Sequence, residues 1–167
     1  MSIMQKLKSH KLPPHEQLAF IGLKQAILGK PHLKSMDKNT KVFFYEVSKS
    51  LCFLCAAGQL VFEDFLRTEY SEENLLFWLA CKDYRKITNK TEMTLAAKRI
   101  YAEFVQVDAP RQINIDCVTR EEISENISQP GTNCFDRAQR QIYGLMENDC
   151  YPRFLKSEIY QSLLEQQ

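Results

Sequence analysis

Glycine and histidine are both scarce in this sequence of 167 residues. None of the five glycines lies close enough to another to form a glycine-rich loop around a phosphate group, which argues against ATP or GTP binding. All three histidines fall within residues 1–40, so a Cys–His pair or a Ser-His-Asp triad in the rest of the chain would lack its base. The sequence therefore argues against several classes of enzyme.

A long hydrophobic run and a secretory leader are also missing. The apolar stretch LCFLCAAGQLVF (residues 51–62) is too short to span a bilayer, and no early apolar run precedes a small-residue cleavage site. We therefore expect an intracellular, cytoplasmic protein whose six cysteines are mostly reduced and buried. Cys52 and Cys55 form a C-x-x-C pair without the second pair that zinc requires, so buried core cysteines are the favoured interpretation and palmitoylation the weaker one.

Positive charge is concentrated at the N-terminus. Residues 1–40 carry seven lysines and two acidic residues, a net charge of +5, whereas residues 41–167 have a net charge of −4. The overall net charge of +1 gives no general attraction to nucleic acid. We expect residues 1–40 to be a basic extension that contacts a membrane surface or a partner, or else a partly disordered terminus, and residues 41–167 to be the folded domain.

Apolar residues recur at helical spacing through most of residues 58–167, where no convincing strand pattern is found. Residues 41–57 are ambiguous and are interpreted as helical. The sequence therefore predicts an all-α bundle. Its expected features are a helix ending near Thr68, an N-cap at Ser71, a helix over 92–107, a loop over 109–116, a T-x-x-E capping box at Thr119 and Glu122, a stop at Pro130-Gly131, a cap at Asn133 and a last helix from Pro152.

An acidic cluster precedes the only tryptophan of the chain. Glu69, Glu72 and Glu73 lie around Ser71, and acidic residues in the first turn of a helix are stabilised by the helix dipole. The cluster lacks the alternate ligands and the mid-loop glycine of a calcium loop, so we expect no metal site and no cofactor. A carboxylate-dependent hydrolase that uses these three residues is the remote alternative. The run LLFWLAC (residues 75–81) that follows is apolar on every side and predicts a buried helix, which leaves the preceding loop tip exposed for recognition.

Four blocks of the sequence resemble the regulator of G-protein signalling (RGS) domain. They are FLRTEYSEENLLFWLAC (Phe65 to Cys81), APRQINID (Ala109 to Asp116) with the Thr119 cap after it, CFDRAQRQIYGLMEND (Cys134 to Asp149) and YPRFLKSEIY (Tyr151 to Tyr160). The resemblance implies a bundle of about nine helices that binds Gα subunits, of Gi/o or Gq type, in the GTP or transition-state form. It also implies that this binding accelerates GTP hydrolysis by Gα, so that the chain is a GTPase activator and not itself an enzyme.

The resemblance also implies which residues contact Gα. The first group is Glu69, Tyr70, Ser71, Glu72, Glu73 and Asn74, the second is Asn114 and Asp116, and the third is Leu145, Asp149, Cys150 and Arg153. By the same resemblance, Phe77, Trp78 and Phe154 belong to the core. Arg153 is expected to orient Asp149 or the acidic loop through a charge-assisted bond. Without the resemblance, an Asx turn would explain Asn114 equally well.

The sequence departs from the family pattern at several positions. Cys150 stands where the family usually has serine, and a thiol is the weaker hydrogen-bonding group. Lys82 replaces a usual acidic residue, and residues 41–57 are atypical throughout. These differences leave open a second interpretation, in which the chain is an RGS-like module that binds Gα without activating it.

Overall fold

The computed structural model describes residues 56–165 of the chain. The chain divides into two compact units, and the described residues of both form helices with no strand. The first unit contains α4 (Ala56–Thr68), α9 (Tyr151–Phe154) and α10 (Glu158–Glu165). The second unit, residues 70–150, contains α5 (Glu72–Tyr84), α6 (Lys90–Ile100), α7 (Cys117–Asn126) and α8 (Asp136–Leu145). The prediction of an all-α fold is thus confirmed for these residues, while the predictions for 1–40 and for most of 41–57 lie outside them.

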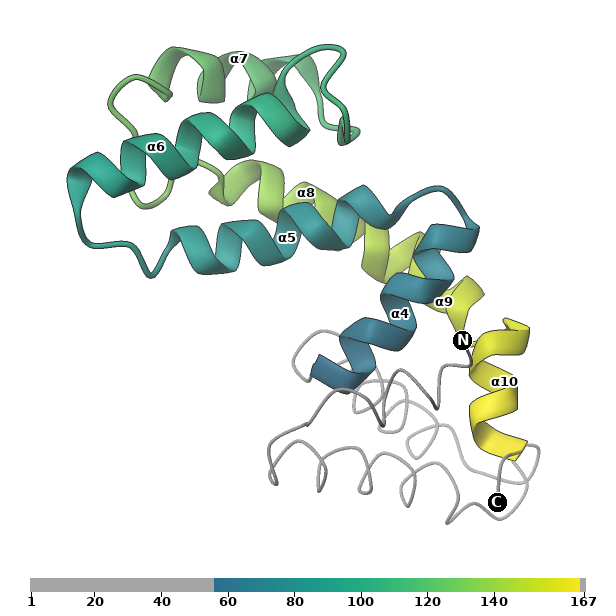
Figure 1. The fold of residues 1–167 in the computed structure, drawn as a ribbon. Helices are drawn as coiled ribbons and strands as arrows, with labels where there is room; N and C mark the ends of the chain where they lie inside the picture. Colours follow the sequence, from purple (N-terminus) through teal and green to yellow (C-terminus); the bar gives the residue numbers. More distant parts are fainter. Residues whose placement is uncertain (1–55, 166–167) are drawn as a thin grey trace, which may run out of the picture. The chain divides into compact units, whose positions relative to one another are not determined.

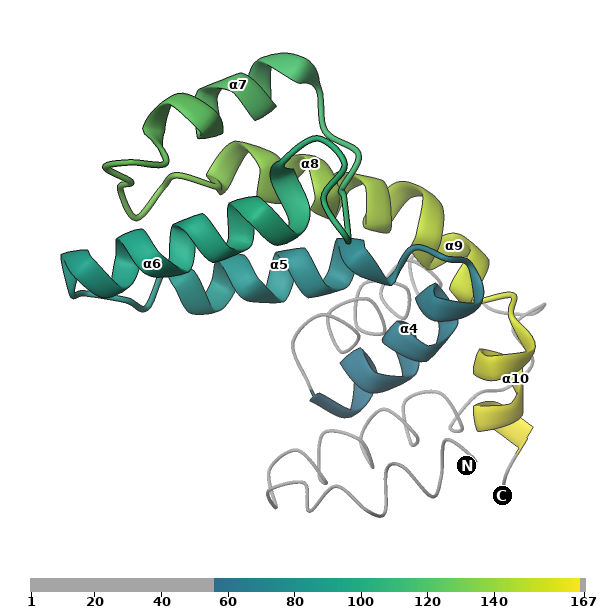
Figure 2. The same ribbon diagram turned by 45° about the horizontal axis from the view of Figure 1, so that its top comes forward.

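Helix α5 is the centre of the second unit. It packs against both α6 and α8, and α7 packs against α8 (Figures 1 and 2). Phe77 of α5 is fully buried, with its ring centroid 5.8 Å from that of Phe104 and 6.2 Å from that of Phe135. Tyr84 at the end of α5 packs edge-on against Phe135 and donates a hydrogen bond of 2.8 Å to the carbonyl of Gly131. Burial raises the pKa of the Tyr84 phenol to about 12.

Trp78 is only partly buried, which corrects the expectation that it belongs to the core. Its ring lies against Tyr143 at 6.2 Å between centroids, and the Lys82 ammonium sits 4.9 Å from the Trp78 centroid. A lysine one helical turn after a tryptophan can reach the ring face, where the π quadrupole attracts the cation. The unusual Lys82 therefore has a local partner.

Both α6 and α8 end in a π-helical segment, a feature that apolar spacing did not predict. The segments are η2 (Tyr101–Val105) after α6 and η3 (Met146–Cys150) after α8. The N–H of Gln106 donates to the carbonyl of Tyr101, five residues back. The helix ends at Gln106, whose φ of −56° and ψ of 148° are not helical. The predicted helix over 92–107 was wrong at its end for this reason, and Val107 lies outside it and is 62% exposed. Leu95 of α6 is also exposed.

Three predicted helix starts differ from the structure. Helix α6 begins at Lys90 and is capped by Asn89, whose side-chain oxygen accepts a 3.0 Å bond from the N–H of Glu92. Helix α7 is capped by Asp116 instead of Thr119, and helix α8 begins at Asp136 rather than directly after Asn133. Asn133 contributes its backbone carbonyl, which accepts from the N–H of Asp136, so the turn before α8 is closed without a side-chain cap. Helix α7 ends at Asn126, before the predicted stop at Pro130-Gly131.

The first unit is held together by aromatic rings. Phe154 is almost fully buried, and its ring centroid lies 5.3 Å from that of Phe62, 5.4 Å from that of Phe65 and 5.1 Å from that of Tyr160. The predicted single helix from Pro152 is two helices here, because Ser157 interrupts it. The Ser157 hydroxyl donates to the carbonyl of Phe154 and accepts from the N–H of Tyr160, which ends α9 and starts α10.

The expectation of mostly buried, reduced cysteines is confirmed only in part. All four cysteines among residues 56–165 are free of disulfides, but Cys117 is exposed and Cys134 is half-buried, while Cys81 and Cys150 are buried. Burial raises the pKa of the Cys81 thiol and raises that of Cys134 to about 11, so both are protonated at neutral pH. Among the described helices, none is long and apolar enough to cross a membrane.

Candidate functional site

The loop before α5 contains a residue, Tyr70, with a left-handed backbone conformation. Tyr70 has a φ of 52° and a side chain that is 92% exposed. A non-glycine residue in this backbone region is uncommon, and an exposed tyrosine at that position contributes nothing to a core. The conformation therefore holds a large aromatic side chain in solvent at the start of the predicted contact region.

The start of α5 is built differently from the expectation. Ser71 occupies the N-cap position, but its hydroxyl makes no capping bond. The side-chain amide of Asn74 instead donates to the carbonyl of Ser71 at 3.1 Å and to Oε1 of Glu73 at 3.2 Å. Asn74 is 4% exposed, so it braces the loop from beneath and is not displayed at its tip as the sequence suggested.

Asn74 also carries an unusual polar atom. Its Oδ1 is buried and has no hydrogen-bond partner in the structure of the described residues. A buried acceptor without a donor costs folding free energy, and such atoms are rare in folded proteins.

A shallow pocket opens beside the same loop. Its volume is about 330 Å³, and its lining residues are Tyr70, Glu72, Glu73, Pro110, Arg111 and Gln112. Burial raises the pKa of Glu73, with a smaller contribution in the same direction from the neighbouring Glu72. The pocket brings the first predicted group of residues next to the segment that leads to Asn114. A cleft thus exists at the acidic cluster, and no group of metal-binding side chains lies among the described residues.

The loop that carries Asn114 is pinned on both sides. Ile113 and Ile115 are buried, with exposed fractions of 0% and 8%, and Asn114 between them is exposed. The N–H of Ile113 donates to the carbonyl of Phe104 at 2.9 Å, and the N–H of Arg111 donates to the carbonyl of Glu103 at 3.0 Å. Because alternate residues of an extended segment point in opposite directions, burial of the two isoleucines directs Asn114 outward.

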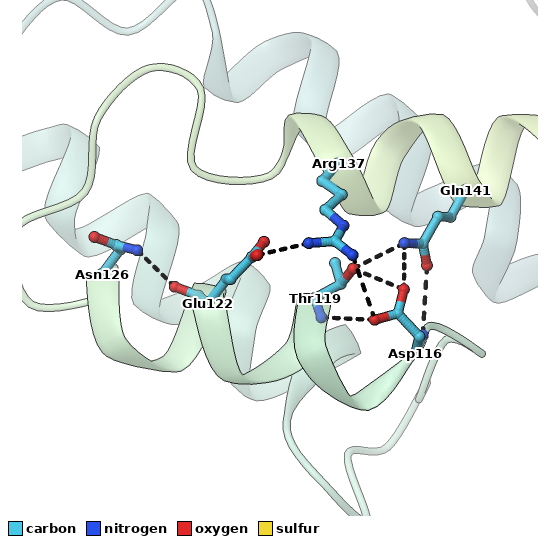
Figure 3. A network of polar contacts seen from close by, with 6 residues as sticks. All are labelled: Asp116, Thr119, Glu122, Asn126, Arg137 and Gln141. Atoms are coloured by element: carbon cyan, nitrogen blue, oxygen red, sulfur yellow. Dashed lines mark hydrogen bonds and ion pairs between the residues drawn. The ribbon is translucent and has the colours of Figure 1, made fainter.

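Asp116, predicted as a contact residue, is engaged within the chain (Figure 3). Its carboxylate accepts from the N–H and from the hydroxyl of Thr119, both at 2.8 Å, and from the side-chain amide of Gln141. These bonds, with the more distant Arg137, lower the pKa of Asp116 to about 2. Asp116 therefore caps α7 and closes the loop, and this role replaces the predicted T-x-x-E box.

Sequence reasoning missed Thr119 and Gln141 as parts of this network. The threonine lies three residues after an aspartate that follows a loop, which is the spacing of an N-cap and its N3 residue. That signal was available in the sequence. Gln141 lies on another helix, 25 residues away, and nothing in the sequence connects it with Asp116.

The third predicted group is spread over three elements, with Leu145 at the end of α8, Asp149 and Cys150 in η3, and Arg153 in α9. Asp149 is exposed and Leu145 is half-buried, whereas Cys150 is 2% exposed. Cys150 is thus buried, although the resemblance places it among the contact residues.

In the first unit, Arg153 of α9 forms an ion pair with Glu69, the residue that follows α4. The guanidinium is 47% and the carboxylate 33% exposed. The prediction that Arg153 holds the acidic loop is confirmed for Glu69. Each of the two residues thus fixes the orientation of the other.

Comparisons with known proteins identify the family to which the sequence is related. The chain matches the family model described as Regulator of G protein signaling domain over residues 48–163. It is 53% identical over 111 residues to Regulator of G-protein signaling 21 from Homo sapiens, covering 66% of this chain and 73% of that protein. It is 50% identical over 109 residues to Regulator of G-protein signaling 8 from Rattus norvegicus, covering 65% of this chain and 61% of that protein. With Regulator of G-protein signaling 1 from Homo sapiens the identity is 49% over 143 residues, covering 80% of this chain and 68% of that protein.

Proposed function

Because this chain belongs to the regulator of G-protein signalling family, we propose that it binds Gα subunits in the GTP or transition-state form and accelerates their GTP hydrolysis. The observation that carries the proposal is the family match over residues 48–163, which contains every residue predicted to contact Gα. The proposal includes attenuation of signalling, because faster hydrolysis shortens the lifetime of the active Gα.

The chemistry asked of this chain is modest. Gα already carries the arginine that stabilises the transition state and the glutamine that orients the attacking water. The partner needs only to bind the switch conformation of the transition state more tightly than the ground state. Each tenfold acceleration requires about 1.4 kcal/mol of such preference. A few fixed polar groups supply this amount, which fits a pinned Asn114 and a braced acidic loop.

Asn114 is the residue on which activation should depend most. Its side chain is exposed, its backbone is anchored on both sides, and the family resemblance directs it to the switch region that holds the glutamine. We expect Asn114→Ala to remove most of the acceleration of single-turnover GTP hydrolysis while the melting temperature stays unchanged. Asn126→Ala, at the exposed far end of α7, is the matched control and should keep the wild-type rate. Full acceleration by Asn114→Ala would contradict this role.

Two rival functions give different results in the same assay. A module that binds without activating would associate with Gα loaded with GDP and aluminium fluoride, a transition-state mimic, but leave the rate unchanged. A carboxylate-dependent hydrolase would show turnover in the absence of any G protein and would lose it in Glu72→Gln or Glu73→Gln. The pocket beside these residues gives that alternative a place to act, so hydrolysis assays without Gα belong to the test.

The preferred Gα class and the cellular location are parts of the same proposal. A panel of Gα subunits should show acceleration for the Gi/o type, the Gq type or both.

The net charge of +5 on residues 1–40 supports a cytoplasmic protein with peripheral contact to the inner face of the plasma membrane. The full chain should then sediment with phosphatidylserine vesicles at low salt and remain free with phosphatidylcholine vesicles. Equal binding to both would contradict the electrostatic contact.

A further inference from the structure

We propose that Gln141 of α8 is a positioning residue for activation, which acts by holding the segment that carries Asn114. This inference rests on the proposed function, because it names a residue that acts through Asn114. Gln141 does not belong to any of the predicted contact groups, and it lies one helix away from the loop that it holds (Figure 3).

The amide of Gln141 binds both the side chain and the backbone of Asp116. Its Nε2 donates to Oδ2 of Asp116 and, at 2.8 Å, to the hydroxyl of Thr119. Its Oε1 accepts from the N–H of Asp116 at 3.4 Å. A primary amide can donate to an ionised carboxylate through its nitrogen and accept from a backbone N–H through its oxygen at the same time.

Asp116 is two residues after Asn114, so a contact that fixes Asp116 also restricts the backbone that carries Asn114. The segment is anchored before Asn114 by the buried Ile113 and after it by the buried Ile115 and by Asp116. Gln141 ties the second anchor to α8, a helix of the unit's core that packs against α5. Without this tie, Asp116 keeps its cap to Thr119 of α7, and its remaining link to α8 is the more distant Arg137.

Arg137, one turn before Gln141, is a weaker candidate for the same role. Its guanidinium is 3.9 Å from Asp116 but makes a close ion pair of 2.6 Å with Glu122 on α7. Arg137, Asp116 and Glu122 are each about half exposed, and ion pairs of this kind contribute little because water and salt screen them. The close contacts from α8 to Asp116 are therefore the hydrogen bonds made by Gln141.

The test compares Gln141→Met, which keeps the length of the side chain and removes its polar atoms, with Gln141→Glu, which keeps the acceptor and places a second carboxylate beside Asp116. We expect either variant to lower the maximal single-turnover rate about three- to tenfold, as for the loss of a net hydrogen bond. The melting temperature of Gln141→Met should fall by only a few degrees, as for the loss of a net hydrogen bond. Arg137→Met should lower the rate by less than Gln141→Met. Gln129→Met, in the exposed turn beyond the other end of α7, is the matched control and should keep the wild-type rate.

A double-mutant cycle separates positioning from a general effect on stability. Affinity for Gα loaded with GDP and aluminium fluoride remains measurable when activation is largely lost, and it is measured for Gln141→Met, Asn114→Ala and the double variant. If Gln141 acts through Asn114, its effect disappears in the Asn114→Ala background. A full, additive effect in that background, or no effect of Gln141→Met alone, would overturn the inference.

Hydrogen exchange tests the contact between Gln141 and Asp116 directly, without any Gα. The N–H of Asp116 should exchange faster in Gln141→Met than in the wild-type chain, because its acceptor is gone. Unchanged exchange would overturn the inference even if activation fell. If the wild-type chain fails to accelerate hydrolysis, the proposed function is wrong, and the exchange result still decides whether Gln141 holds the segment.

Discussion

Arg153 of α9 and Glu69 at the end of α4 form an ion pair across 84 residues of sequence. The pair joins a residue of the first predicted contact group to one of the third. Both side chains are partly exposed, so the pair adds little to stability, and its effect is to orient two charged groups that face solvent. Arginine suits this role because its rigid guanidinium fixes direction as well as charge.

The pair predicts that the two residues are coupled in Gα binding. We expect Arg153→Met and Glu69→Gln each to weaken binding to Gα loaded with GDP and aluminium fluoride. The double variant should lose less than the sum of the two losses, with a coupling of about 0.2–1 kcal/mol, because each residue loses its orientation when the other is removed. Isothermal titration calorimetry on the four proteins measures this coupling. Strictly additive losses would show that the residues act independently.

Phe154 should be the residue of the first unit that is most sensitive to substitution. It is 1% exposed and packs against four other rings, those of Phe62, Phe65, Tyr151 and Tyr160. We expect Phe154→Leu to lower the free energy of unfolding by about 1–3 kcal/mol, less than the 3–5 kcal/mol typical of truncation to alanine.

Urea denaturation measures the effect of Phe154→Leu. Tyr70→Leu is the matched control, because its aromatic ring is 92% exposed and should change the free energy of unfolding by less than about 0.5 kcal/mol. Equal losses for the two variants would mean that the cluster around Phe154 does not determine the stability of the chain.

The sequence predicted the all-α class and most helix positions because apolar spacing reports which residues face a core. Phe77, in the apolar run LLFWLAC that was expected to be buried, is fully buried, and Phe135 and Ile142 are buried in the same unit. Spacing does not report how a helix ends. The π-helical segments η2 and η3 depend on backbone hydrogen bonds that any residue can make, so the end of the 92–107 helix was predicted wrongly.

The family resemblance assigns positions to the candidate site, but it does not predict what each side chain contacts. Tyr70 and Asn114 are exposed, in agreement with contact residues, whereas Asn74 and Cys150 are buried and Asp116 is a helix cap. The resemblance to a family locates a residue in the chain. Whether its side chain faces solvent or its neighbours depends on tertiary packing, which for Asp116 involves Gln141, a residue on another helix.

The Asp116 cap predicts a defined dependence of stability on pH. Its folded-state pKa, about 2, lies below the ordinary value of 3.8, so the ionised form stabilises the fold above about pH 4 and this contribution is lost as the pH falls toward 2. Asp116→Asn keeps the cap and removes the charge. The melting temperature of the wild-type chain should therefore exceed that of Asp116→Asn by a constant amount from pH 7 to 5, and the difference should shrink below about pH 4.

The charged groups around Asp116 define the control. Arg137 and Glu122 are the ionisable side chains that face it across the network. Arg137→Met should reduce the difference between aspartate and asparagine at position 116, because the guanidinium is part of what stabilises the charge. A difference that stays constant down to pH 2 would contradict the charge-assisted cap.

Glu73 should affect the pH dependence of stability in the opposite direction to Asp116. Its substitution should also change stability and Gα binding in opposite directions. Burial raises its pKa, so the ionised carboxylate destabilises the fold at neutral pH, and this cost disappears as the pH falls through the folded-state pKa to the ordinary range. We expect Glu73→Gln to raise the melting temperature at pH 7, with a gain that vanishes near pH 4, and to weaken binding to Gα because a predicted contact charge is lost. Glu72→Gln, in the same helical turn, is the control and should give no such gain, since acidic residues in a first turn are favoured by the helix dipole. A lower melting temperature of Glu73→Gln at pH 7, measured by calorimetry between pH 4 and 8, would show that burial of this carboxylate carries no cost.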